Sequence, residues 1–411
     1  MKKQLTVALG LAVIAAPAFA TKARLEALGE DNYGSYYIND NRNMFLNPAR
    51  INDHKDTVNY EFGASGAGGS VTDSTAAPKA EGGFTKGHGN MVYGLQFGNT
   101  SPQVGLVRGL AGTGGTGGSA LSERQPWDLF VGGDAGMKWG ANFTYENHDS
   151  GRADSDTRIS SSALRTRLGV VMGDLDVFAH VSLNNKANNH QGGMVDGDLG
   201  YLIGASQMVN NYRLFAEWRQ INAEYRSDAA VAAGGTANKK EDFKYNQLRL
   251  GAARQERLND KASLFAKVMI VRQTAEDDGG FLGGNASNTL GTGNGFAAAG
   301  DATIWTAPLT LGTEYNATSW LDLRASISQN VYSNVETDPK GGGAAGKKAS
   351  GHIANTAVRA GASIKFGEFS VDGLLSTAND GDAANTTDGS TAGGNLRTDK
   401  LMTRVSMIYR F

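Results

Sequence analysis

Residues 401–411 read LMTRVSMIYRF, and their side chains alternate between apolar and polar. One set of alternate positions is apolar except for Thr403, and it comprises Leu401, Val405, Met407, Tyr409 and Phe411. The opposite set comprises Arg404, Ser406 and Arg410, with Met402 and Ile408. Successive side chains of a strand point to opposite faces, so the pattern predicts a β-strand with one apolar and one polar surface. Both soluble β-sandwiches and membrane β-barrels use such strands.

The same period of two recurs from residue 57 onwards. In residues 137–146, one face holds Met137, Trp139, Ala141, Phe143 and Tyr145. Equivalent alternation is found in residues 164–172, 175–183, 212–219, 321–328 and 358–366. The phase slips between Tyr245 and Leu248, which predicts a bulge or a strand end there. The sequence therefore predicts an all-β fold.

The connections between these segments form two classes that alternate along the chain. Short ones lie near residues 99–102, 132–134, 173–174, 209–211, 254–260, 316–319 and 367–368. Long polar ones lie near 65–88, 111–125, 147–160, 184–197, 222–241, 273–301, 331–352 and 377–395. This alternation predicts a transmembrane up-and-down antiparallel β-barrel of about sixteen strands, with long extracellular loops and short periplasmic turns; fourteen or eighteen strands would also fit. Residues 81–110 can be divided into strands in more than one way.

The composition excludes several classes of protein. The 411 residues include no cysteine, which rules out disulfides, zinc–thiolate sites and cysteine nucleophiles. The formal net charge of −2 gives no reason to expect nucleic acid as a partner. No stretch after residue 20 approaches the ~20 apolar residues that a membrane helix needs.

The chain divides into three parts. Residues 1–20 have the features of a secretory signal peptide: Lys2 and Lys3, an apolar run over 5–16, and the small-x-small site Ala18-Phe19-Ala20. Residues 21–56 lack the strand pattern, and Pro48 interrupts regular structure, so we interpret them as a periplasmic lead-in or a plug. Residues 57–411 form the predicted barrel.

The barrel region resembles Gram-negative outer-membrane porins of the sixteen-stranded general-diffusion type. The signal peptide and the terminal aromatic residue Phe411 carry the most specific part of this resemblance. It implies location in the cell outer membrane, contact with the lipid bilayer, and assembly as a homotrimer. It also implies that the barrel-assembly machinery reads Tyr409 and Phe411 as a membrane-assembly signal.

The polar faces of the predicted strands carry many charges opposite apolar rows. We expect these side chains to line a water-filled lumen: Arg165, Arg167, Arg213, Glu217, Arg219, Arg249, Asp322, Arg324, Arg359, Lys365 and Arg404. Aromatic residues crowd at strand ends, as the two interfaces of a bilayer select. Those beside long loops are Trp127, Tyr145, Trp218, Phe243, Tyr245 and Trp305.

These features predict a porin for passive diffusion of ions and small hydrophilic solutes. The resemblance implies that the third long loop, 147–160, folds inwards and places Asp149, Asp154 and Asp156 at a constriction; an ordinary exposed loop is the alternative. Two other functions stay open. One is a FadL-like carrier of hydrophobic compounds, whose hatch Asn47-Pro48-Ala49 faintly resembles, and the other is a structural or adhesive surface protein.

No motif indicates catalysis. The six histidines are scattered without HExxH or metal-ligand spacing, and no GxSxG or GxxxxGK[ST] motif occurs. His180 near Asp176 could be posed as a hydrolase pair, but a polar lumen wall explains both residues more simply. We therefore expect no enzyme activity, no cofactor and no metal.

Replacing Phe411 by Asp, or deleting it, is expected to impair insertion without changing the conductance of the channels that do insert. The resemblance makes this residue an assembly signal, and an aromatic side chain also favours the membrane interface. The heat-modifiable fraction of the protein in outer-membrane preparations measures the effect. Normal accumulation of either variant would contradict the prediction.

Overall fold

The computed structural model describes residues 21–31, 33–63, 79–111, 123, 125–150, 158–189, 193–226, 240–278, 300–339, 349–351, 355–376, 380–381 and 404–411. The predicted signal segment 1–20 lies outside these residues. The helices are α2 (Lys22–Ala27), α3 (Asn43–Leu46), the 3-10 helix η1 (Pro48–Asp53) and α4 (Pro102–Ala111). No helix among the described residues is long and apolar enough to cross a membrane.

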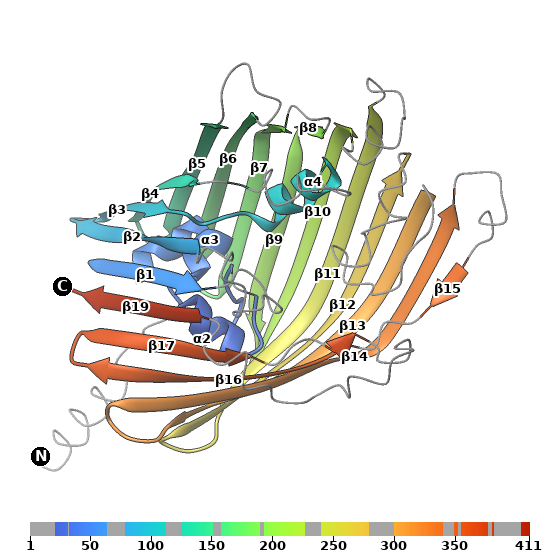
Figure 1. The fold of residues 1–411 in the computed structure, drawn as a ribbon. Coiled ribbons are helices and arrows are strands. Elements are labelled where there is room, and N and C mark those ends of the chain that lie inside the picture. Colours follow the sequence, from blue (N-terminus) through green and yellow to red (C-terminus); the bar gives the residue numbers. More distant parts are fainter. Residues whose placement is uncertain are drawn as a thin grey trace, which may run out of the picture.

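The remaining elements are strands of a single antiparallel sheet (Figure 1). They are β1 (Thr57–Gly63), β2 (Lys79–His88), β3 (Met91–Phe97), β4 (Trp127–Asp134), β5 (Lys138–Ser150), β6 (Ile159–Met172), β7 (Leu175–Asn188), β8 (Met194–Gly197), β9 (Gly200–Val209), β10 (Tyr212–Arg226), β11 (Glu241–Arg257), β12 (Ala262–Asp277), β13 (Gly300–Asn316), β14 (Leu321–Pro339), β15 (Ala349–Gly351), β16 (Asn355–Phe366), β17 (Phe369–Ser376), β18 (Asp380–Gly381) and β19 (Arg404–Arg410).

The sheet closes on itself. Its first strand, β1, pairs with its last, β19, from Thr57 opposite Arg410 to Gly63 opposite Arg404. The short pieces β8, β15 and β18 share a partner strand with β9, β16 and β17 respectively. Within the described residues the fold is therefore a closed up-and-down barrel of sixteen strands, which confirms the predicted fold class.

The short turns include two that the sequence predicts at Gly173-Asp174 and Gly367-Glu368. Both glycines have positive φ, +58° and +61°, a backbone conformation in which a side chain would be strained. Each permits a two-residue hairpin between long strands.

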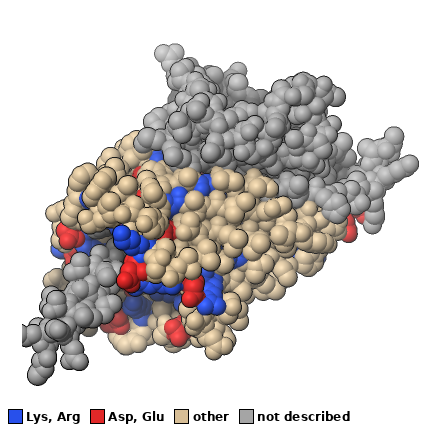
Figure 2. All heavy atoms as spheres, turned by 90° about the horizontal axis from the view of Figure 1, so that it is seen from below, with Lys and Arg blue, Asp and Glu red and all other residues tan. Residues whose placement is uncertain are grey.

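The strand faces follow the predicted alternation. Leu129, Phe143 and Leu168 are more than half exposed, whereas Asp128, Asn142 and Arg167 beside them in sequence are buried. Apolar side chains therefore form the outer surface and polar ones point inwards. Figure 2 shows acidic and basic side chains gathered in one region, while much of the visible face carries neither. An apolar outer band is the surface that a lipid bilayer requires.

The division of residues 79–111 differs from the prediction. The structure places β2 inside the predicted loop 65–88, and the predicted short connection at 99–102 leads into α4 instead of a strand. The sequence pattern does not predict β2, because apolar and polar side chains alternate poorly in KAEGGFTKGH. The helix α4 begins at Pro102, whose fixed φ suits the first helical position. The prediction lacks β2 and assigns a strand to residues that form α4. The two differences cancel, so the predicted total of about sixteen strands is unchanged.

Phe243 and Tyr245 also differ from the prediction, because they belong to no outer aromatic belt. They are 1% and 3% exposed and point inwards, where they pack with Ile221 and with Val107 of α4. β11 runs through this region with unbroken register, so the apparent phase slip is an apolar patch on the inner face. The helix α4 packs on this patch through Val107.

A buried ion pair fixes α4 against the wall. Val104, Val107 and Arg108 share one buried face of the helix, as their spacing of three and four residues requires. The guanidinium of Arg108 donates to both carboxylate oxygens of Glu146, at 3.2 and 2.7 Å, and its Nε donates to Asn185 at 3.0 Å. The connection between β3 and β4 thus folds inwards.

Replacing Arg108 by Met is expected to destabilise the barrel by about 3–5 kcal/mol, because it leaves the Glu146 carboxylate buried without its cation. The temperature at which heat-modifiable migration is lost measures the effect. Arg158→Met is the matched control, because it breaks an exposed pair with Asp149 that solvent screens, and little stability should be lost. Equal losses in the two variants would refute a special role for the α4 contact.

Candidate functional site: the barrel lumen

Residues 21–31 and 33–56, here called the plug, fold inside the barrel (Figure 1). Side chains of the plug reach inward-facing residues all round the wall, including Asp372 on β17, Glu314 on β13 and Asp176 on β7. Local capping shapes its helices. Thr21 accepts from the Arg24 backbone N–H at the start of α2, and Asn47 accepts from the Ala49 N–H before η1.

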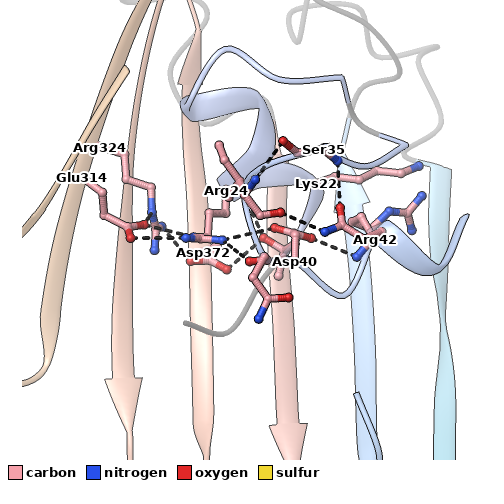
Figure 3. A network of polar contacts seen from close by, with 12 residues as sticks. Lys22, Arg24, Ser35, Asp40, Arg42, Glu314, Arg324 and Asp372 are labelled. Atoms are coloured by element: carbon pink, nitrogen blue, oxygen red, sulfur yellow. Dashed lines mark hydrogen bonds and ion pairs between the residues drawn. The ribbon is translucent and has the colours of Figure 1, made fainter. Parts of the chain in front are cut away.

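Charges of both signs anchor the plug on one side of the barrel (Figure 3). Arg24 donates to both carboxylate oxygens of Glu314, at 3.0 and 3.3 Å, and lies 3.4 Å from Asp40. On the wall, Arg324 pairs with Glu314 at 2.5 Å and with Asp372 at 3.0 Å. The Thr21 hydroxyl donates to Asp372 at 2.8 Å. Each buried charge thereby has opposite charges within bonding range.

A second set of contacts holds Arg42 and Lys22 of the plug. Arg42 lies 3.4 Å from Glu81 and 3.9 Å from Glu61, donates to Asn99 at 2.7 Å, and stacks over the Phe45 ring at 4.1 Å. Lys22 pairs with Glu81. The plug is therefore tied to β1 and β2 as well as to β13 and β17.

The pair His180 and Asp176 contacts the plug. His180 Nε2 lies 2.7 Å from the Leu46 carbonyl oxygen, and Asp176 accepts from Arg50 Nε at 2.9 Å and from the Asn47 amide. Both side chains are thus occupied by contacts that hold the N-terminal segment.

The residues predicted to line the lumen all lie on the inward face, and most are paired. Short pairs join Arg165 to Glu123, Arg167 to Asp128, Arg324 to Glu314, Lys365 to Asp322 and Arg404 to Glu26. Arg213 donates to the Asp174 carbonyl at 2.6 Å. By contrast, Arg219 and Arg249 reach Glu217 only at 3.5 and 3.7 Å, and Arg359 makes no ion pair with a described residue. Sequence reasoning did not find the partners that the plug supplies, because they are far away in the chain.

Asp149 does not line a constriction, so its predicted place is wrong. β5 continues to Ser150, which puts Asp149 on the same outward face as Phe143. Its carboxylate is half exposed and pairs with Arg158 at 2.7 Å. Asp154 and Asp156 lie outside the described residues.

Two cavities adjoin the plug, and both are lined in part by β10, β11 and β12. The cavity towards the long loops has a volume of about 390 Å³ and is lined by Tyr36, Arg219 and Arg249 among others. The cavity towards the short turns has a volume of about 440 Å³ and is lined by Tyr37 and Arg213 among others. The neighbouring plug residues Tyr36 and Tyr37 therefore line different cavities.

Tyr36 is held by three contacts, one of which is a tilted contact with the Phe178 ring at a centroid distance of 6.1 Å. Its ring stacks on Phe215, with ring centroids 4.4 Å apart and planes inclined by 9°. Its hydroxyl donates to Glu217 at 3.0 Å. Tyr37 donates to Glu30 at 3.1 Å. These contacts fix two neighbouring plug residues that line different cavities.

Burial shifts three titratable groups of the plug. It raises the pKa of the Asp40 carboxyl to about 7, against the opposing effect of Arg24. It lowers the pKa of the Lys22 ammonium to about 8, and nearby Arg42 acts in the same direction. It lowers the pKa of the His54 imidazole to about 4. The docked plug thus disfavours the charged form of each group.

The closed sheet with an apolar exterior and a charged interior defines the class of this protein, an outer-membrane-type β-barrel with an internal plug. No family model and no curated protein sequence matches the chain. Solved structures similar to it include OmpT of Vibrio cholerae, with 11% identity, 86% of this chain and 95% of that chain covered, and a TM-score of 0.36. A FadL homologue of Pseudomonas aeruginosa matches with 13% identity, 95% and 98% coverage and a TM-score of 0.38. A porin refined at 1.8 Å matches with 12% identity, 87% and 99% coverage and a TM-score of 0.39.

Docking of the plug is expected to weaken as the pH rises, through Asp40. The pKa of this carboxyl is about 7 when docked, against an ordinary value of 3.8, so docking is favoured at low pH and loses this contribution between about pH 4 and 7. Asp40→Asn removes the effect. Hydrogen–deuterium exchange of residues 33–46, compared between parent and variant at each pH, measures it.

His54 contributes with the opposite sign, because its depressed pKa makes docking less favourable as the pH falls from about 6.5 to 4. That contribution is common to both proteins and cancels in the comparison. A parent–variant difference that stays constant from pH 4 to 8 would rule out the Asp40 effect.

Proposed function

We propose that this protein is an outer-membrane channel that lets ions and small hydrophilic solutes diffuse across without catalysis. The observation that carries the proposal is the pair of cavities beside the plug, one lined by Tyr36 and the other by Tyr37. Charged residues line both cavities, and such a wall suits water and polar solutes. In this proposal the protein acts in the bilayer, is inserted by the barrel-assembly machinery, and associates as a homotrimer.

The plug sets the resting conductance in this proposal. Tyr36 lines one cavity and Tyr37 the other, and Tyr36 is held by its ring contacts with Phe215 and Phe178 and by the bond to Glu217. The ion pairs of Arg24 and Arg42, which anchor the rest of the plug, lie elsewhere. Movement of residues around Tyr36 would join the cavities without undocking α2.

A carrier of hydrophobic compounds is the second candidate. The folded plug inside the barrel favours it, as does the apolar inner patch around Phe243 and Tyr245. The charged wall beside both cavities supports the polar channel instead. Swelling of liposomes in sugar solutions, compared with uptake of a long-chain fatty acid, separates the two functions.

Replacing Tyr36 by Ala is expected to raise single-channel conductance in planar bilayers severalfold, because it removes the ring that lies beside the cavity and the contacts that hold it. Tyr332→Ala is the matched control, since that ring is 56% exposed on the outer surface. The channel proposal fails if neither parent nor Tyr36→Ala conducts, and the gating role of Tyr36 fails if both conduct equally.

A tether tests how much of the plug must move. The chain has no cysteine, and a Cβ built on Gly361 would lie 2.7 Å from the Ala27 Cβ, so a small shift brings the pair to the ~3.8 Å of a disulfide. Ala27→Cys with Gly361→Cys is expected to conduct equally when oxidised and reduced. Loss of conductance on oxidation would show that α2 must undock.

A further inference from the structure

The inner wall carries one group of charges that the protein itself satisfies poorly. Arg219 on β10 lies directly opposite Gln247 on β11, and Glu217 lies directly opposite Arg249. All four residues line the 390 Å³ cavity. The Nε atoms of Arg219 and Arg249 and the side-chain oxygen of Gln247 are buried without a hydrogen-bond partner among the described residues.

The ion pairs in this group are long. Glu217 lies 3.5 Å from Arg219 and 3.7 Å from Arg249, and it also accepts the Tyr36 hydroxyl. Charge-assisted hydrogen bonds are normally about 2.7–2.9 Å long. Elsewhere in the lumen Arg167 donates to Asn142 at 2.6 Å and to Asp128 at 3.0 Å. The Glu217 carboxylate is therefore shared weakly by two guanidinium groups, and the one other carboxylate within ion-pair distance of Arg249 among the described residues is Asp31, at 3.9 Å.

The cavity as a whole has an excess of positive charge. Its lining contains five basic and three acidic side chains, and Arg359 across from the group makes no ion pair with a described residue. Apolar side chains adjoin the charges: Leu202 lies opposite Arg219, and Val271 lies opposite Arg249. A volume of about 390 Å³ is within the range of small-ligand pockets, roughly 300–1,000 Å³.

We propose that this cavity binds a small organic carboxylate, whose anionic group accepts from Arg219 and Arg249 and whose apolar body lies against Leu202 and Val271. A carboxylate has the geometry that guanidinium N–H groups recognise. It supplies the charge and the acceptors that the wall lacks. The proposal names a class of solute for the proposed channel. Transport of that solute rests on the proposed channel function, whereas binding to the cavity does not.

Binding of sodium benzoate to the full mature protein in detergent, followed by isothermal titration calorimetry, tests the site. Benzoate is expected to bind saturably in the millimolar range. Its neutral isostere benzamide should bind at least about tenfold more weakly, because it lacks the charge that strengthens the hydrogen bonds. Acetate should also bind more weakly, because it has no apolar body. Equal binding of benzoate and benzamide, or no benzoate binding, overturns the proposal.

Variants locate the site. Arg219→Gln and Arg249→Gln are each expected to weaken benzoate binding about tenfold or more. Arg213→Gln is the matched control: it removes the same charge from the inward face of the same strand, but Arg213 lines the other cavity. It should change binding less than about twofold, on the same scale. An equal loss in Arg213→Gln would show a general charge effect and overturn the assignment.

Conductance separates this proposal from the channel itself. If the barrel conducts chloride but benzoate fails to bind, the carboxylate site is wrong and the channel function stands. If benzoate binds as expected in a barrel that conducts nothing, the site stands and the channel function fails. Heat-modifiable migration of each variant verifies folding, and the benzoate–benzamide comparison needs no variant.

Discussion

The structure depends on closure of the sheet. In hydrocarbon, an unpaired backbone N–H or carbonyl costs several kcal/mol, so a spanning sheet cannot keep a free edge. Pairing of β1 with β19, from Thr57 opposite Arg410 to Gly63 opposite Arg404, removes the edge. It also brings the start of the barrel, and with it the plug that precedes Thr57, next to the end of the chain. The plug therefore enters the lumen beside the closing seam.

Closure creates an interior in which charges must be compensated. Arg324 would be costly in the wall alone, but Glu314, Asp372 and the incoming Arg24 form a network in which every charge faces its opposite. The group of charges around Glu217 is the exception, because it is compensated less completely. Around Glu217 the plug contributes Tyr36 and the distant Asp31, and two guanidinium groups are left with weak partners. The filled side of the lumen is structural, and the poorly compensated side is where a solute has something to bind.

The two cavities and the helix α4 divide the lumen between them. α4 covers the apolar inner patch near the long loops and is fixed by the Arg108–Glu146 pair. Both cavities are lined in part by β10, β11 and β12, and Tyr36 and Tyr37 are among their plug residues. The ion pairs that anchor α2 and Arg42 belong to other strands, whereas on this wall Glu30 of the plug pairs with Lys267 of β12. The proposed channel thus combines a rigid plug with one short adjustable segment.

The sequence by itself determined which side chains face outwards and, through the alternation of short and long connections, the barrel: Leu323 and Ile327 face outwards and Asp322 and Arg324 inwards, because a strand's period of two is local. Other features were decided only by the tertiary structure. The sequence pattern predicts a strand near residues 102–111, but these residues form α4, which packs on the apolar inner patch. It also places Asp149 in a loop, but β5 continues past this residue. The partners of the inward arginines were equally hidden, since Arg24 and Glu314 are 290 residues apart. Side-chain direction follows from neighbours in the chain, whereas occupancy of a lumen depends on which distant residues closure brings together.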